Sequence, residues 1–270
     1  MNRFLLRSMT ELSSRKWISR LTGRFAKSRQ SRIFLARFVK LYGINVDEAE
    51  KPFKQYESLN EFFTRRLQEG ARPIDHSADT LTSPVDALIT GIGTIKDGTI
   101  VNVKGQDYTV DELLSHSPRM ENYRNGRYIV LYLSPTDYHR IHAPATGRIV
   151  EREHIAGKVY PVNDFGMRHM RGVLSRNERL ITYIRLKEGE VAVVKVGAMN
   201  VSSIRYTEPL ADTVQKGEEL AYFEFGSTVV LLTQQGLFVP RPDLKEGVKI
   251  KMGEALGKLG VQPSVSGAAE

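Results

Sequence analysis

The residues best suited to acid–base chemistry lie in one short segment of the chain. Between Asp137 and His142, two histidines, a tyrosine, an aspartate and an arginine occur within six residues. Histidine suits general acid–base catalysis because its pKa lies near neutrality. The same composition also fits a polar turn with histidines at the surface. The segment alone therefore does not decide between a catalytic and a structural role.

His139 and His142 must also be considered as metal ligands. A His-x-x-His pair needs at least one further ligand to hold a metal ion. The other histidines, at positions 76, 116, 154 and 169, show no spacing typical of a metal site. We therefore predict no metal. The chain also contains no cysteine, which excludes a disulfide framework and a cysteine nucleophile.

Two further segments contain reactive side chains but are less specific. Asp86 follows Ser83-Pro-Val, a context in which aspartate usually caps a turn. Ser227 follows Gly226 between two apolar runs, where a Gly-Ser step usually marks a β-bulge or a tight turn. The surrounding residues do not form a Gly-x-Ser-x-Gly elbow. By itself, neither segment indicates catalysis.

The elements that must position these residues are mostly β-strands. From about residue 80, short β-branched runs are bounded by Gly, Pro, Asn or Asp, a pattern typical of strands joined by turns. Short helices are expected at 110–115 and within 58–68. We predict an α+β fold that is mainly β, a compact antiparallel sandwich or barrel preceded by N-terminal amphipathic helices. The expected strands are 88–95, 127–133, 147–151, 180–186, 190–196, 228–233 and 248–252.

A weak internal repeat refines this fold prediction. Segment 214–223 resembles segment 250–259, and their glycines, Gly217 and Gly253, are 36 residues apart. A Gly-Glu-x-Leu turn after a β-branched strand is the signature of lipoyl- and biotinyl-type barrels. Segment 142–150 has a related Ala-Pro-x-x-Gly pattern. We therefore expect lipoyl-like half-motifs within the β fold.

The positive charge of the protein is concentrated at its N-terminus. The 270 residues carry a net charge of +8, yet residues 1–40 alone contain 11 basic residues and one acid, Glu11. The body of the chain is therefore nearly neutral, and the basicity is a terminal feature. No apolar run approaches the ~18 residues needed to cross a bilayer.

Apolar residues recur every three or four positions among these basic residues, as on one face of a helix. We expect such helices to lie in the interface of an anionic membrane, where each basic residue contributes about 1 kcal/mol. Packing against the body, with solvated basic faces, is an alternative. We do not expect nucleic acid as a partner, because no recognition motif accompanies the charge. The apolar positions are Phe4, Leu5, Met9, Leu12, Trp17, Ile18, Leu21, Phe25, Phe34, Phe38 and Leu41.

Taken together, these segments resemble one known family, the pyruvoyl-dependent phosphatidylserine decarboxylase proenzymes of the prokaryotic type. The resemblance covers the chain from about residue 50, whereas residues 1–49 match only as a basic amphipathic lead-in. Ala87 replaces the usual glycine after the aspartate, and Phe225 replaces a frequent leucine. The matching segments are 56–75, Ser83-Pro-Val-Asp86, Asp137-Tyr-His-Arg-Ile-His142-Ala-Pro, Asn177-Glu-Arg, Val196-Gly-Ala and Phe225-Gly-Ser-Thr228.

The resemblance implies that the chain cuts its own backbone between Gly226 and Ser227. The Ser227 hydroxyl would attack the Gly226 carbonyl, with His142 as the base and Asp86 orienting the imidazole. The resulting ester would be eliminated, and hydrolysis would leave a pyruvoyl group at the new N-terminus. Residues 1–226 would form the large chain and residues 227–270 the small chain.

The implied activity is that of a carboxy-lyase, which converts phosphatidylserine to phosphatidylethanolamine and CO2. The pyruvoyl group, the only cofactor implied, would form a Schiff base with the substrate amine and act as an electron sink. His139 is expected near the step that returns a proton to the α-carbon.

The resemblance also implies an organisation for the whole chain. Residues 1–49 would be membrane-associating helices, and residues 50–270 the decarboxylase domain. The large and small chains would form a heterodimer, with higher assembly left open. We expect a peripheral protein at the cytoplasmic face of the cell membrane, bound to an anionic surface.

Three functions from other classes remain open at this point. A serine hydrolase could use the same residues on an external substrate, but it would keep its hydroxyl. A lipoyl-like carrier presents a lysine between its half-repeats, whereas Lys251 lies inside the second one. A structural adaptor at the membrane surface would need none of Asp86, His142 and Ser227.

Overall fold

The computed structural model describes residues 16–260 apart from 104–105, 163, 199–203, 210 and 225–226. The first four apolar positions of the predicted N-terminal helix and the predicted cleavage residue Gly226 lie outside the described residues. Ser227 is described through its backbone alone, since its side chain belongs to the undescribed part.

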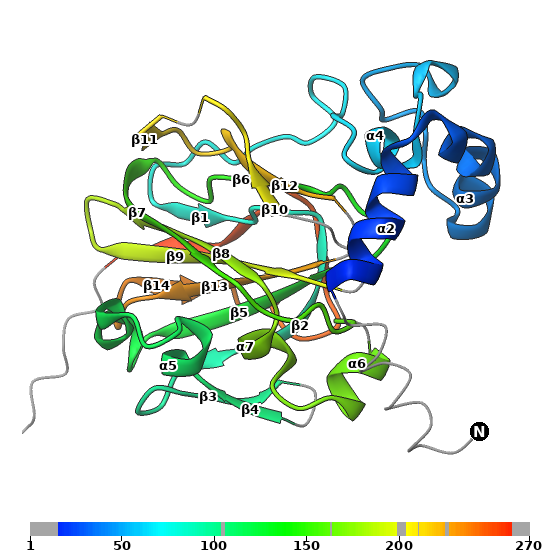
Figure 1. The fold of residues 1–270 in the computed structure, drawn as a ribbon. Helices are drawn as coiled ribbons and strands as arrows, with labels where there is room; N and C mark the ends of the chain where they lie inside the picture. Colours follow the sequence, from blue (N-terminus) through cyan, green and yellow to red (C-terminus); the bar gives the residue numbers. More distant parts are fainter. Residues whose placement is uncertain are drawn as a thin grey trace, which may run out of the picture.

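An eight-stranded antiparallel sheet forms the middle layer of the body (Figure 1). Its strands are rich in Val, Ile and Leu because most of them are covered on both faces. In spatial order they are β11 (Thr213–Val214), β7 (Gly147–Ile155), β8 (Arg179–Arg185), β9 (Glu190–Gly197), β13 (Ser227–Thr233), β5 (Arg127–Leu133), β2 (Ala87–Thr94) and β15 (Lys249–Ile250).

Two three-stranded sheets cover one face of this layer. Their strands are short, and they pack on the central sheet through a shared apolar core. One sheet has the order β1 (Thr80–Thr82), β16 (Ala255–Leu259), β14 (Phe238–Pro240). The other has the order β10 (Ile204–Tyr206), β12 (Glu219–Phe223), β6 (Arg140–His142).

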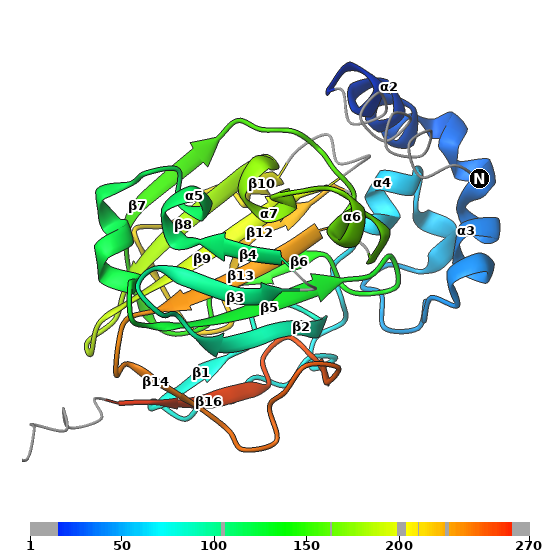
Figure 2. The same cartoon turned by 90° about the horizontal axis from the view of Figure 1, so that it is seen from below.

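Short helices and a hairpin cover the opposite face (Figure 2). The alternation along β13 shows how both faces are filled. Val229 and Leu231 belong to the first core, and Val230 and Leu232 to the second, as the period of two in a strand requires. This second layer contains β3 (Thr99–Val103), β4 (Gln106–Thr109), α5 (Val110–Leu113), the 3-10 helix η3 (Pro118–Tyr123), α6 (Asp164–His169) and α7 (Val173–Arg176).

The internal repeat corresponds to two halves with the same backbone hydrogen bonds. The Thr82 amide donates to the Pro144 carbonyl, and the His142 amide donates to the Pro84 carbonyl, each at 2.9 Å. Thr82 and His142 therefore occupy equivalent positions, as do Asp86 and Thr146. Further matched pairs are Ser83 N–Glu254 O with Ala143 N–Glu218 O, Gly253 N–Ser83 O with Gly217 N–Ala143 O, and Ile89 N–Val248 O with Ile149 N–Asp212 O.

We call these units the first half (β1, β2, β15 and β16) and the second half (β6, β7, β11 and β12). Their short strands pair in equivalent registers, Leu81 opposite Gly257 and Ile141 opposite Ala221. Each half contains one of the predicted glycine turns, and both glycines have positive φ, 82° at Gly217 and 87° at Gly253. The predicted mainly β fold with antiparallel sheets and N-terminal helices is confirmed.

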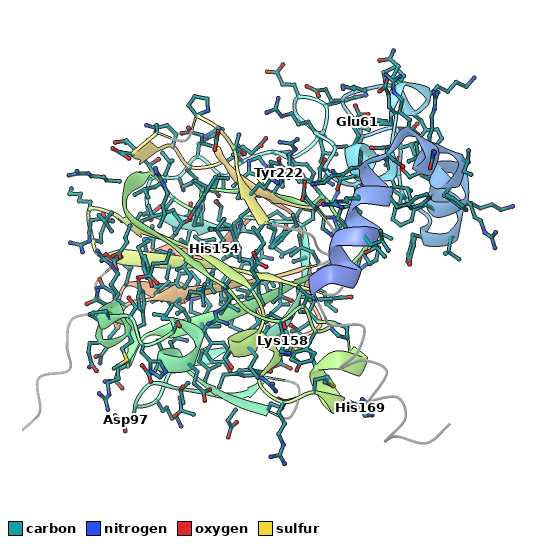
Figure 3. All side chains as sticks on the ribbon, in the orientation of Figure 1. Glu61, Asp97, His154, Lys158, His169 and Tyr222 are labelled. Carbon is teal, nitrogen blue, oxygen red and sulfur yellow. The ribbon has the colours of Figure 1, made fainter. Side chains whose placement is uncertain are left out.

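The N-terminal region, residues 16–72, packs at one end of the body and contributes side chains to it. Its own apolar core includes Leu35, Ile44, Tyr56 and Phe62, so it crosses the boundary expected between residues 49 and 50. Figure 3 labels Glu61 on this region and Tyr222 on the neighbouring strand β12. The helices are α2 (Lys16–Lys27), η1 (Arg29–Phe34), α3 (Leu35–Tyr42), η2 (Phe53–Gln55) and α4 (Leu59–Phe63).

Candidate active site

Three neighbouring strand ends meet at one edge of the central sheet. Ser227 begins β13 and pairs with Leu133, the last residue of β5. On the other side of β5, Leu88 of β2 pairs with Tyr132, so Asp86 lies just before β2 at the same edge. Because adjacent strands are about 4.8 Å apart, Asp86 and the backbone of Ser227 flank the end of β5.

The histidine segment leaves from this end of β5 and passes the predicted cleavage point. After Leu133 the chain turns, and the His139 carbonyl accepts a hydrogen bond from the Phe223 amide at 3.0 Å. Phe223 ends β12, and Ser227 begins β13. The end of β12 is therefore bonded to the segment that carries the two histidines, and the start of β13 pairs with the end of β5, from which that segment leaves.

The Asp86 carboxylate is buried and held by strong hydrogen bonds. Arg72 Nε donates to Oδ1 at 2.9 Å and Arg72 Nη2 donates to Oδ2 at 2.6 Å. The Met252 amide also donates to Oδ1, at 2.9 Å. Paired donors of this kind fix both the position and the plane of a carboxylate.

His142 is oriented by a backbone carbonyl. Its Nδ1 lies 2.7 Å from the Gly217 carbonyl oxygen, which can only accept, so Nδ1 carries the proton. Its Nε2 is then the basic nitrogen and accepts from the Tyr138 hydroxyl at 3.1 Å. Burial lowers the pKa of His142, which keeps the imidazole neutral and able to accept a proton.

The group that orients the His142 ring therefore differs from the one we expected. We expected Asp86 to orient the imidazole, but the Gly217 carbonyl does so in this structure, while Asp86 is bound to Arg72 and Met252. The physical reason is the fold: the glycine turn of the second half presents its carbonyl to Nδ1. Asp86 still acts on His142 through its charge, which opposes the effect of burial on the imidazole pKa.

His139 is completely buried and stacked against the N-terminal region. Its ring centroid lies 3.9 Å from that of Phe63. Nδ1 donates to the Asp137 carbonyl at 2.8 Å, so Nε2 is the basic nitrogen, and it has no hydrogen-bond partner among the described residues. Burial lowers the pKa of His139 to about 3, so the ring is neutral near pH 7.

The N-terminal region also reaches the strand connection next to Ser227. The buried carboxylate of Glu224 lies 2.7 Å from Lys27 Nζ at the end of α2. Together with Phe63 on His139 and Arg72 on Asp86, this gives three contacts between residues 16–72 and the site. The N-terminal region therefore forms part of the wall of the site.

Sequence reasoning missed five residues at the site: Phe63, Arg72, Tyr138, Gly217 and Met252. Tyr138 stood inside the histidine segment, and Gly217 and Met252 stood inside the internal repeat. Phe63 and Arg72 belong to the 56–75 segment, whose role was not resolved. Their partners are distant in sequence, so no local pattern marks them.

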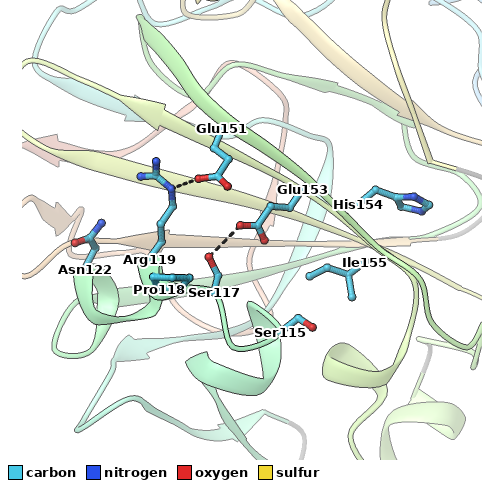
Figure 4. A pocket seen from close by; sticks show the side chains of 9 residues that line it. All are labelled: Ser115, Ser117, Pro118, Arg119, Asn122, Glu151, Glu153, His154 and Ile155. Atoms are coloured by element: carbon cyan, nitrogen blue, oxygen red, sulfur yellow. Dashed lines mark hydrogen bonds and ion pairs between the residues drawn. The ribbon is translucent and has the colours of Figure 1, made fainter.

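A cavity remote from this edge does not bring together reactive groups of the same kind. A cavity of about 660 Å³ lies between β7 and residues 115–122 (Figure 4). Its charged and polar groups are already paired, Arg119 with Glu151 and Ser117 with Glu153. Among the described residues, no group of His, Asp and Glu is arranged to hold a metal ion.

Known proteins that are similar to this chain carry the name of the same enzyme. A phosphatidylserine decarboxylase proenzyme of Bacillus thuringiensis subsp. konkukian (strain 97-27) is 43% identical over 256 residues, covering 95% of this chain and 97% of that protein. Another, of Geobacillus kaustophilus (strain HTA426), is 44% identical over 257 residues with the same coverage. The family model described as phosphatidylserine decarboxylase matches residues 59–258. The chain therefore belongs to the phosphatidylserine decarboxylase family, whose members are carboxy-lyases.

Proposed function

We propose that this chain decarboxylates phosphatidylserine to phosphatidylethanolamine with a pyruvoyl group made from its own Ser227. The observation that carries the proposal is the meeting of three features at one sheet edge. These are the start of β13, the Asp86 carboxylate, and the His142 imidazole with its basic Nε2, whose backbone amide donates to the Pro84 carbonyl two residues before Asp86. The relatives are named proenzymes, which agrees with activation by cleavage.

In the cleavage reaction, His142 Nε2 is the base that takes the Ser227 hydroxyl proton. The oxygen then attacks the Gly226 carbonyl carbon, and the acyl group moves from the Ser227 nitrogen to its oxygen as an ester. Loss of the Ser227 α-proton expels the Gly226 carboxylate, which becomes the end of the large chain. Addition of water and loss of ammonia leave the pyruvoyl group at residue 227. The negative charge of Asp86 stabilises the imidazolium that forms at His142.

The chain offers a suitable place for this group, because the strand that residue 227 starts is buried and His139 and His142 of the neighbouring segment are buried as well. The pyruvoyl group supplies an electron sink for the charge left when CO2 departs. The His139 ring is held by Phe63 and by the Nδ1 hydrogen bond to Asp137, and its Nε2 has no hydrogen-bond partner among the described residues. We assign His139 the handling of the proton at the substrate α-carbon.

We also propose that the N-terminal region binds an anionic membrane surface at the cytoplasmic face. Its apolar side chains are unusually exposed, 62% for Leu21, 78% for Ile33 and 73% for Leu41. Basic residues stand between them, including Arg24, Arg29 and Arg32. Exposed apolar side chains interleaved with basic ones along a helical segment favour an anionic lipid interface. Among the described residues no helix is long and apolar enough to span a membrane.

The catalytic proposal is tested with Ser227→Ala. We expect this variant to remain a single chain and to release no CO2 from phosphatidylserine, while Thr82→Ala is cleaved and active. Activity of the uncut Ser227→Ala chain would refute the pyruvoyl mechanism.

The membrane proposal is tested by replacing Leu21, Phe25, Ile33 and Leu41 with serine. These side chains are exposed, so the core that contains Leu35 is preserved, unlike in a deletion of residues 1–40. We expect the variant to cleave itself but to lose sedimentation with vesicles containing phosphatidylglycerol. Unchanged sedimentation would overturn the assignment of this surface.

A further inference from the structure

We propose that Arg72 is a positioning residue for self-cleavage, acting through Asp86. This inference rests on the proposed function, because it assumes that Asp86 assists His142 as it takes the Ser227 hydroxyl proton. Arg72 lies outside the three segments that carry the reacting groups, at the end of the N-terminal region and before the first strand, β1.

The contact is more extensive than a surface ion pair. Arg72 uses Nε and Nη2 on the two oxygens of Asp86, and the side chains are only 8% and 9% exposed. Nη2 also donates to Glu48 at 2.8 Å, and Nη1 donates to the Ala71 carbonyl at 2.7 Å. The guanidinium is therefore fixed from two other sides, and its plane determines the plane of the Asp86 carboxylate.

The electrostatics explain why Asp86 needs such a partner. A carboxylate buried without a cation loses several kcal/mol of hydration that nothing replaces. Burial acts to lower the pKa of Arg72, but the hydrogen bonds to Asp86 and Glu48 outweigh it, and the net pKa is raised. Arg72 thus stays charged and supplies the cation that the buried Asp86 carboxylate needs.

The second half of the body supplies an internal comparison. At the position equivalent to Asp86 stands Thr146, whose hydroxyl accepts from the Lys216 amide at 3.0 Å, as Asp86 accepts from Met252. Among the described residues, no guanidinium hydrogen-bonds to Thr146. The backbone contact belongs to the scaffold, whereas the guanidinium accompanies only the half that carries a carboxylate.

The test compares Arg72→Met with Arg119→Met. Arg119 also joins two carboxylates, Glu151 and Glu190, but at the remote cavity of Figure 4. We expect Arg72→Met to slow the appearance of the two chains roughly 100-fold, the loss that follows a displacement of about 1 Å in a catalytic group. Arg119→Met should cleave at the rate of the unmodified protein even if it unfolds at a lower temperature.

A double variant shows whether Arg72 acts through Asp86. We expect Asp86→Asn/Arg72→Met to cleave no more slowly than Asp86→Asn alone, and guanidinium ion to restore part of the rate of Arg72→Ala. A normal rate in Arg72→Met, or additive losses in the double variant, would overturn the inference. A normal rate in Asp86→Asn would instead overturn the proposed function, so the two failures are distinguishable.

Discussion

The two halves of the body share a scaffold but differ in the side chains at two equivalent positions. The amides of Thr82 and His142 make the same hydrogen bond, and so do the amides of Met252 and Lys216 toward Asp86 and Thr146. The first half thus presents a carboxylate, and the second half presents an imidazole. The reactive groups were placed by one backbone pattern used twice, and the chemistry depends on which side chain occupies each equivalent position.

A second difference between the halves is their covering. Residues 59–72 cover the site in the first half, where Phe63 packs on His139 and Arg72 binds Asp86. The equivalent edge of the second half has its own cavity of about 590 Å³, lined by His76, Thr146 and Lys216 among others. Covering one edge excludes water from it, which makes its charges and hydrogen bonds stronger.

The largest expected effect on the cleavage rate distinguishes substitution of His142 from substitution of its equivalent, Thr82. His142→Ala removes the base, and we expect self-cleavage to slow on the order of 10⁶-fold, as when a catalytic histidine is lost from a triad. Thr82→Ala removes a hydroxyl that bonds the Pro144 carbonyl, so cleavage should stay near normal. Densitometry of the two chains over time measures both. Cleavage of His142→Ala at the normal rate would contradict the assignment of His142 as the base.

The next largest effect on the cleavage rate distinguishes substitution of Asp86 from substitution of its equivalent, Thr146. Asp86→Asn keeps the shape but removes the charge that stabilises the imidazolium, and we expect a loss on the order of 10⁴-fold. Thr146→Ala should cost only about 1 kcal/mol of stability, the usual contribution of one hydrogen bond, and leave cleavage unchanged. Equal rates in the two variants would mean that the charge at position 86 has no role.

The pH dependence of stability tests whether His139 is buried and neutral in the folded protein. Its pKa in the folded protein, about 3, lies below the ~6.5 of an unfolded chain. The unfolded state therefore binds the extra proton between these values, and stability falls as the pH drops from 6.5 toward 3. In the uncut Ser227→Ala background, His139→Gln should lower this slope by up to about 1.4 kcal/mol per pH unit. Urea unfolding between pH 4 and 7 measures it.

The exposed His154 provides the control for that measurement. It lies on β7 with its side chain 59% exposed, so His154→Gln removes a histidine without removing a buried ring and tests whether the change of slope at position 139 depends on burial. A slope in His139→Gln equal to that of the parent would show that position 139 is not a buried neutral histidine.

The smallest effect concerns Ala87 and its equivalent, Gly147. A Cβ at Gly147 would lie 2.5 Å from the Arg185 carbonyl oxygen, so we expect Gly147→Ala to destabilise the fold by about 1–3 kcal/mol. Ala87 has no positive φ, and Ala87→Gly should cost only about 0.5–1 kcal/mol. Thermal unfolding of the two variants shows which substitution destabilises the fold more. Similar losses at both positions would show that the halves are packed alike here.

The elements of this fold were visible in the sequence because strand periodicity and turn residues are local signals. The strand expected at 127–133 is β5, and that expected at 190–196 falls within β9. The repeat around Gly217 and Gly253 indicated the half-motifs correctly. The helix predicted within 58–68 is α4, which starts at the N-cap Ser58.

The contacts that complete the site were not visible because they join distant residues. Gly217, which orients His142, is 75 residues away from it, and Met252 is 166 residues from Asp86. The apolar core formed by residues between 35 and 62 also gave no local signal, since its members are spread over that stretch of the chain. Only packing in three dimensions decides these contacts.

The central claim is that one edge of this sheet cuts the chain before Ser227, and the intact mass of the purified protein tests it most directly. The account predicts two masses, for residues 1–226 and for residues 227–270 with a pyruvoyl group in place of Ser227, and the smaller chain should be blocked to Edman degradation. A single full-length mass from protein that decarboxylates phosphatidylserine would contradict it.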